Sequence, residues 1–249
     1  MRYFIELAYC GTAYHGWQIQ PSAKSVQETI EKELSTLLRQ ATSIVGAGRT
    51  DTGVHASYYV AHFDSPQELD SKQIKFKLNC MLPTDISIYN IEKVNDNAHA
   101  RFDAVSRTYN YFINNTKHPF GRNLFWDFRQ DLDIALMNDG CSFLVGTKDF
   151  TSFSKLHTDV NNNICELQFA EWSKTEHGYK FEIRANRFLR NMVRAIVGTL
   201  VEVGLQKIPP SEIEEILSKK NRKFAGTSVP AQGLFLSGIE YPFQITIDN

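Results

Sequence analysis

Hydrophobic and polar residues alternate along residues 3–9, which predicts a β-strand close to the start of the chain. From Ser25 onward the apolar period changes to three or four, which predicts an amphipathic helix. Ser25 and Glu28 have the spacing of a capping box, so we expect this helix to begin at Ser25. Its apolar side consists of Val26, Ile30, Leu34, Leu37 and Leu38.

The same two patterns continue to about residue 94. Short apolar runs predict strands at 44–45, 58–63 and 85–94, and a helical period covers 71–80. Together with the first two elements this gives the order β-α-β-β-α-β, which is typical of a ferredoxin-like or split βαβ unit.

A second set of elements follows in a similar order. Residues 164–172 and 179–185 have the pattern of a hairpin, and Ser211 with Glu214 predicts the start of a short helix. The other expected strands and helices cover 105–114, 133–145, 188–203 and 234–241. Because strands and helices do not alternate regularly, we expect an α+β fold rather than a doubly wound sheet.

Composition excludes several classes of protein. The 249 residues are 42% hydrophobic and 22% charged, as in ordinary globular domains, which excludes a disordered chain. The net charge of −1 excludes a uniformly basic protein but leaves room for a local basic patch. The sequence shows no signal-peptide pattern, no apolar stretch of ~20 residues and no closely spaced pair among its four cysteines. We therefore expect a cytoplasmic protein with reduced thiols.

Residues 46–56, GAGRTDTGVHA, form the most unusual segment of the chain. Three glycines permit tight turns around Arg49 and Asp51, and the segment lies between two predicted strands. Catalytic and binding residues often lie on loops held by a rigid scaffold, so Asp51 is a candidate catalytic residue. The alternative is a structural turn in which Asp51 bonds its own backbone.

Other interpretations of the segment have less support. It lacks the Gly-Lys-Ser/Thr ending of a phosphate-binding P-loop. Asp51-Thr52-Gly53 is the triplet of aspartic proteases, but those enzymes need two carboxylates and the triplet occurs once, so a protease would need the second copy from a homodimer. Asp51 and His55 suggest a metal site, yet no third ligand stands at a convincing spacing.

Basic residues gather toward the end of the chain. Arg187, Arg190 and Arg194 are spaced by three and four, so we expect them to share one face of the helix predicted at 188–203. Such a face is either exposed to solvent or binds the phosphate backbone of a nucleic acid. The cluster of basic residues at 219–223 has the same two possible explanations. Aromatic rings on which unstacked bases could lie are Tyr14, Trp17, Tyr109, Tyr111 and Phe120. The alternative is that most of these rings belong to the core, because 12% of all residues are aromatic.

Eight segments, in order, resemble the TruA family of tRNA pseudouridine synthases, and together they extend over nearly the whole chain. They are FIELAYCGTAYHGWQIQ (4–20), SVQETIEKEL (25–34), GAGRTDTGVHA (46–56), LNCMLPTDISI (78–88), AHARFDAVSRTYNYFI (98–113), GTKDFTSF (146–153), RANRFLRNMVRAIVGTLVEVG (184–204) and VPAQGLFLSGIEY (229–241).

The resemblance implies a fold and an activity. The fold is the α+β pseudouridine synthase fold, with two ferredoxin-like or RRM-like halves that share a mainly antiparallel sheet around a central cleft. The halves would be residues 1–100, with the aspartate loop, and 101–249, with the stacking tyrosine and the basic helix. The reaction is isomerisation of uridine to pseudouridine at positions 38, 39 and 40 of the tRNA anticodon stem-loop. The family uses no cofactor and no metal, and it works as a homodimer.

The resemblance also assigns roles to residues. Asp51 is the catalytic aspartate, Tyr109 packs against the target base, and Arg194 pairs with Asp51. Arg49 helps to take the target nucleotide out of its stack, and we expect Arg187 and Arg190 to contact phosphates. Departures from the family pattern are Thr52, Asn110 and Asn191, none of which is part of the expected chemistry. The alternative function is a non-catalytic RNA-binding protein on the same scaffold.

Overall fold

The computed structural model describes residues 1–155 and 162–245. They form two compact units, one of residues 1–106 with the segment from Leu236 onward and one of residues 107–235. Both units combine β-strands with α-helices, so the predicted α+β class is confirmed. In the described part of the chain, no helix has the length and apolar character needed to cross a membrane.

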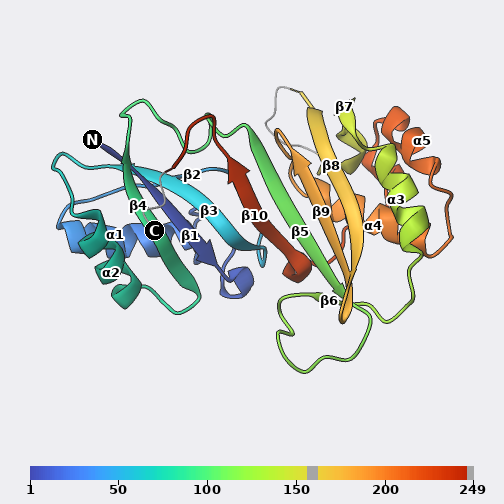
Figure 1. The fold of residues 1–249 in the computed structure, drawn as a ribbon, viewed down its shortest axis with the longest axis horizontal. Helices are drawn as coiled ribbons and strands as arrows, with labels where there is room; N and C mark the ends of the chain where they lie inside the picture. The colour runs from blue at the N-terminus through green and yellow to red at the C-terminus, as the bar shows by residue number, and fades with distance from the viewer. Residues whose placement is uncertain (156–161, 246–249) are drawn as a thin grey trace. The chain divides into compact units, whose positions relative to one another are not determined.

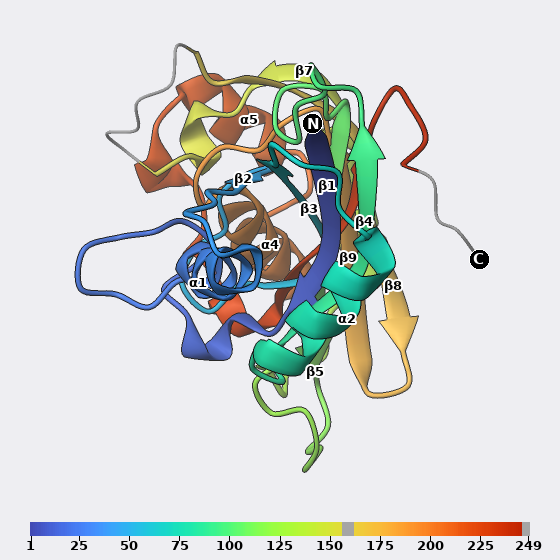
Figure 2. The same cartoon turned by 90° about the vertical axis from the view of Figure 1, so that its left-hand side faces the viewer.

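The first unit follows the predicted β-α-β-β-α-β order. Strand β1 (Arg2–Tyr9) lies between β4 (Ile86–Val94) and β3 (His55–Asp64), and both pairings are antiparallel. The short β2 (Val45–Gly46) pairs with β3, which gives the order of a split βαβ unit. Helices α1 (Val26–Leu38) and α2 (Ser71–Met81) lie beside each other against this sheet (Figures 1 and 2).

Local signals explain the boundaries of α1. The Ser25 side chain accepts a hydrogen bond from the backbone N–H of Glu28 at 3.2 Å, as the capping box predicts. The helix ends where Arg39 takes a left-handed φ of 56°. Val26, Ile30 and Leu34 are buried, so the predicted apolar stripe faces the sheet.

The second unit is built on a strongly paired hairpin. Strands β8 (Ile164–Thr175) and β9 (Gly178–Ala185) are antiparallel, as predicted, and β9 also pairs with β5 (Ser106–Asn114). The helices of this unit are α3 (Ile134–Ser142), α4 (Met192–Gly204) and α5 (Glu212–Lys219), which gather on one side of the hairpin (Figure 1). The buried core includes Leu167, Trp172, Phe181, Ile196 and Leu200.

Two of the strands and all of the 3₁₀ turns were not predicted. Strand β6 (Trp126–Asp127) pairs with β5, and β7 (Gly146–Asp149) pairs with β8. Segments this short carry no periodic signal. The 3₁₀ turns are η1 (Gly11–Ala13), η2 (Thr151–Phe153), η3 (Arg222–Phe224) and η4 (Ala231–Gly233).

The start of one helix and the cap of another differ from the prediction. Helix α4 begins at Met192 rather than at residue 188, because Asn191 takes a left-handed φ of 64°. Arg187 and Arg190 therefore precede the helix, and the expected common helix face with Arg194 was wrong. Ser211 caps α5 without a side-chain hydrogen bond, since its own backbone is already helical, so the capping box predicted there was also wrong.

The last strand, β10 (Leu234–Glu240), lies with the first unit from Leu236 onward. The backbone N–H of Val105 donates to the Glu240 carbonyl at 2.8 Å, and the Ser57 hydroxyl donates to the Leu236 carbonyl at 3.5 Å. The resemblance implied two α+β halves, residues 1–100 with the aspartate loop and residues 101–249 with the stacking tyrosine and the basic helix. That division stays a prediction.

Candidate active site

Asp51 lies in the tight loop between β2 and β3, and it is half-buried. The backbone N–H of Val54 donates to the Asp51 carbonyl at 3.1 Å, which closes a turn. Gly53 supports this turn with a φ of 76°, a conformation that side chains larger than hydrogen disfavour. The segment therefore forms a hydrogen-bonded turn, and the backbone at Asp51 has a defined conformation.

A second segment, residues 9–17, holds this loop in place. The Tyr9 hydroxyl and the Thr50 hydroxyl are 2.8 Å apart, and the backbone N–H of Gly53 donates to the Tyr14 carbonyl at 3.3 Å. A methyl group on Gly11 would overlap the Val54 carbonyl oxygen, so the two backbones touch. Sequence reasoning missed Gly11 because the contact joins segments that are far apart in the chain.

Tyr14 and Trp17 belong to this support and are not platforms for bases. Both rings are buried, and Trp17 stacks on Tyr59 with 4.1 Å between ring centroids. The Tyr59 hydroxyl donates to the Gly48 carbonyl, so the stacked pair also fixes the start of the loop. Burial and the Asp85 carboxylate together raise the pKa of the Tyr14 hydroxyl, which donates to that carboxylate at 2.6 Å. The predicted base-stacking role of these two rings was wrong.

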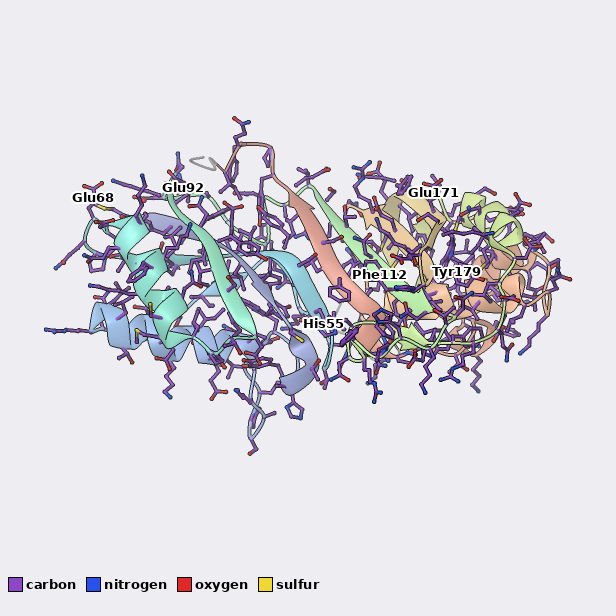
Figure 3. The ribbon with its side chains drawn as sticks, turned by 60° about the horizontal axis from the view of Figure 1, so that its bottom comes forward. His55, Glu68, Glu92, Phe112, Glu171 and Tyr179 are labelled. Carbon is purple, nitrogen blue, oxygen red and sulfur yellow. The ribbon has the colours of Figure 1, made fainter. Side chains whose placement is uncertain are left out.

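His55 supports the same loop from the start of β3 (Figure 3). It is buried, and its Nδ1 accepts a hydrogen bond from the backbone N–H of Gly11 at 3.0 Å. An accepting Nδ1 places the proton of the neutral ring on Nε2. Within residues 1–155 and 162–245, no three His, Cys, Asp or Glu side chains gather as a metal site would require. The bond to Gly11 gives His55 a structural role in this loop.

Arg49 lies two residues before Asp51 and is exposed. The buried neighbours Ala47 and Thr50 fix the backbone on either side of it. An exposed guanidinium on a fixed backbone is accessible to a nucleic acid, and its role in displacing a nucleotide stays a prediction.

Tyr109 lies on β5 opposite Ile183 of β9. Its ring is half-buried and meets the Phe188 ring edge to face, with 5.1 Å between centroids. Tyr111, two residues along the strand, is buried, and its hydroxyl donates to the Pro230 carbonyl at 2.8 Å. Burial raises the pKa of the Tyr111 hydroxyl. Tyr111 is thus a core residue, and Tyr109 remains as a candidate stacking ring on this strand.

Arg194 lies in the first turn of α4 and is half-buried. Its Nε donates to the Val229 carbonyl at 2.7 Å, and the Val229 backbone N–H donates to the Arg194 carbonyl at 3.2 Å. This reciprocal pair of bonds orients the guanidinium plane. The carboxylate that Arg194 was predicted to hold is in the first unit, and the pairing of Asp51 with Arg194 stays a prediction.

Arg187 and Arg190 differ in their surroundings. Arg187 is half-buried, and its Nη2 donates to the Asn162 carbonyl at 2.6 Å. It also approaches Cys165, whose pKa burial raises to about 11 in spite of the nearby guanidinium. Arg190 is exposed, and its carbonyl accepts from the Lys155 backbone N–H at 3.1 Å. RNA contact by either residue stays a prediction, and the exposed Arg190 is the more accessible of the two.

The basic cluster at 219–223 is partly engaged with the protein itself. Lys219 lies 3.8 Å from Glu215, and Lys220 lies 3.1 Å from Asp149. Arg222 donates to the Ser228 hydroxyl at 2.9 Å. Three of its basic side chains thus have partners within the second unit.

Comparison with known proteins agrees with the sequence pattern. A family model described as tRNA pseudouridine synthase matches residues 7–103 and 141–242. The chain is 53% identical over 246 residues to tRNA pseudouridine synthase A of Bacteroides fragilis, covering 98% of each chain. It is 53% identical to the protein of that name from Bacteroides thetaiotaomicron (98% and 92% covered) and 38% identical to that from Bacillus subtilis (97% and 99% covered). The chain therefore belongs to the TruA family of tRNA pseudouridine synthases.

Proposed function

We propose that this protein isomerises uridine to pseudouridine in tRNA, at positions 38, 39 and 40 of the anticodon stem-loop. The observation that carries the proposal is 53% identity over 98% of both chains to a tRNA pseudouridine synthase A. The braced loop that presents Asp51 supports it, because a catalytic carboxylate needs a fixed position. The three nucleotide positions come from the family resemblance.

The reaction breaks the bond between C1′ and N1, turns the detached uracil and joins C1′ to C5. The C5 proton is then lost and N1 gains a proton, so the product is an isomer of the substrate. Asp51 supports this either by attacking a carbon of the nucleotide or by removing a sugar proton to give a glycal-like intermediate. Both routes need an ionised carboxylate, and a guanidinium beside it, as predicted for Arg194, favours that form.

Tyr109 is proposed to hold the detached uracil while it turns. Its half-buried ring, braced by Phe188, offers a flat apolar surface for the base. The tyrosine hydroxyl is a candidate acceptor for the C5 proton.

The target base must leave its stack before it can react, at a cost of a few kcal/mol. Arg49 is proposed to assist this step from its exposed place beside Asp51. Arg187, Arg190 and other basic residues are proposed to offset the cost through phosphate contacts. We also propose that the protein works as a homodimer in the cytoplasm, with one tRNA touching both subunits; light scattering on the purified protein tests the dimer.

The experiment that tests the proposed function maps pseudouridine in an unmodified tRNA transcript after incubation with the protein. Carbodiimide labelling followed by primer extension is expected to give new stops at positions 38, 39 or 40 wherever the transcript has uridine. Stops only at other positions would contradict the assigned sites. Intact binding with no new stop would instead favour the non-catalytic RNA-binding protein.

A further inference from the structure

A strap of eight residues, Arg222–Val229, crosses the first half of α4 within the second unit. A methyl group on Gly198 would overlap the Thr227 carbonyl oxygen, and one on Gly226 would lie 2.9 Å from the Thr199 Cα. The Gly226 backbone N–H also donates to the Thr199 hydroxyl at 2.9 Å. The strap and the helix therefore touch backbone to backbone, and a shift of one moves the other.

The end of the strap holds Arg194. Val229 supplies the carbonyl that accepts from the Arg194 Nε at 2.7 Å, and the Tyr111 hydroxyl fixes the next carbonyl, that of Pro230, at 2.8 Å. A bond at Nε sets the plane of the guanidinium, so a carboxylate is then bound through the Nη groups. The position of the Val229 carbonyl thus decides where those Nη groups point.

One side chain of the strap, that of Ser228, accepts two hydrogen bonds. Its hydroxyl oxygen accepts from the Asn191 Nδ2 at 2.5 Å and from the Arg222 Nη2 at 2.9 Å. Asn191 is the left-handed residue that immediately precedes α4. The Arg222 Nη1 donates to the Ala225 carbonyl at 3.0 Å. Ser228 therefore connects the start of the helix to the strap, one residue before Val229.

We propose that Ser228 is a positioning residue for the reaction: held between Asn191 and Arg222, it places the Val229 carbonyl and thereby orients Arg194. This rests on the proposed function, and in particular on the predicted pairing of Arg194 with Asp51. Ser228 acts through Arg194 and does not itself touch the substrate. Its loss is expected to lower kcat with little change in KM for tRNA, since a small misplacement affects chemistry more than binding.

The test measures kcat and KM for pseudouridine formation in variants of the full-length protein. Ser228→Ala removes both hydrogen bonds, and kcat is expected to fall about ten-fold while KM stays within about two-fold. Ser228→Thr keeps the hydroxyl and is expected to recover most of the rate. Ser218→Ala is the matched control, because Ser218 is exposed on α5 and its hydroxyl donates to the Glu215 carbonyl of the same helix.

A double variant separates positioning from a general loss of structure. In an Arg194→Lys background, which has no Nε donor, Ser228→Ala is expected to change kcat less than about two-fold. Additive losses would overturn the proposal, and so would an equal rate for Ser228→Ala and wild type. If the wild-type protein makes no pseudouridine, the proposed function fails first. If wild type is active and Arg194→Lys keeps full rate, only the positioning inference fails.

Discussion

At the scale of single residues, the Asp51 loop depends on close contacts made by glycines. Gly11 lies against the Val54 carbonyl and Gly16, with a φ of 89°, lies against the Thr50 carbonyl. These contacts leave no room for a side chain, whereas a methyl group on Gly48 would have no atom within 4 Å. The motif that contains Asp51 is visible in the sequence, but the glycines that support it are recognisable only from the fold.

Gly11→Ala is therefore expected to lower the free energy of unfolding by about 2 kcal/mol, because the new methyl group displaces the loop backbone. Gly48→Ala, in the same loop, is the control and is expected to change it by less than about 0.5 kcal/mol. Urea titration of the two variants measures the difference. Equal effects would show that the close approach at Gly11 is not a constraint.

His62 makes the stability of the fold dependent on pH. Burial, aided by the nearby Arg2 charge, lowers the pKa of this histidine to about 4 from its usual value of 6.5. Its Nδ1 accepts from the backbone N–H of Ala100 at 3.1 Å, a bond that needs the neutral ring. Below pH 6.5 this histidine binds a proton in the unfolded chain but stays neutral in the folded chain. The free energy of unfolding therefore falls as the pH drops toward 4.

This prediction is checked by measuring stability between pH 4 and pH 7. His62→Asn keeps an acceptor near the Ala100 N–H and is expected to flatten the dependence, whereas exposed His15→Asn is expected to leave it unchanged. A wild-type slope that survives in His62→Asn would assign the effect to other groups.

At the scale of elements, the starts of α1 and α4 show what sequence can and cannot predict. The start of α1 is set by Ser25 and Glu28, which are neighbours in sequence, and the prediction was correct. The start of α4 depends on Asn191, which bonds Ser228 across 37 residues of sequence. No local pattern contains that bond, so the helix was predicted one turn too early and the arginines before it were placed on its face.

The two predicted capping serines provide a matched test. Ser25→Ala is expected to destabilise the protein by about 1 kcal/mol, because it removes the bond to the Glu28 N–H. Ser211→Ala is expected to cost less than about 0.5 kcal/mol, since Ser211 makes no side-chain cap bond. Comparable losses in thermal or urea unfolding would contradict this account of the helix starts.

At the scale of the whole molecule, the predicted catalytic and RNA-binding residues come from both units. Asp51 and Arg49 lie in the first, and Tyr109 and Arg194 lie in the second. The α+β class and the two rounds of strands and helices followed from periodicity alone. The return of β10 to the first unit did not, because pairing between distant strands leaves no trace in local spacing.

The central claim is that Asp51 carries out the chemistry of a tRNA pseudouridine synthase. The most direct measurement is tritium release from tRNA containing [5-³H]uridine, because the C5 hydrogen leaves only when C5 becomes the new glycosidic carbon. Wild type and the control Asp131→Ala, at an exposed aspartate, are expected to release tritium. Asp51→Ala is expected to release none while binding tRNA within a few-fold of wild type. Release by Asp51→Ala at the wild-type rate would contradict the account.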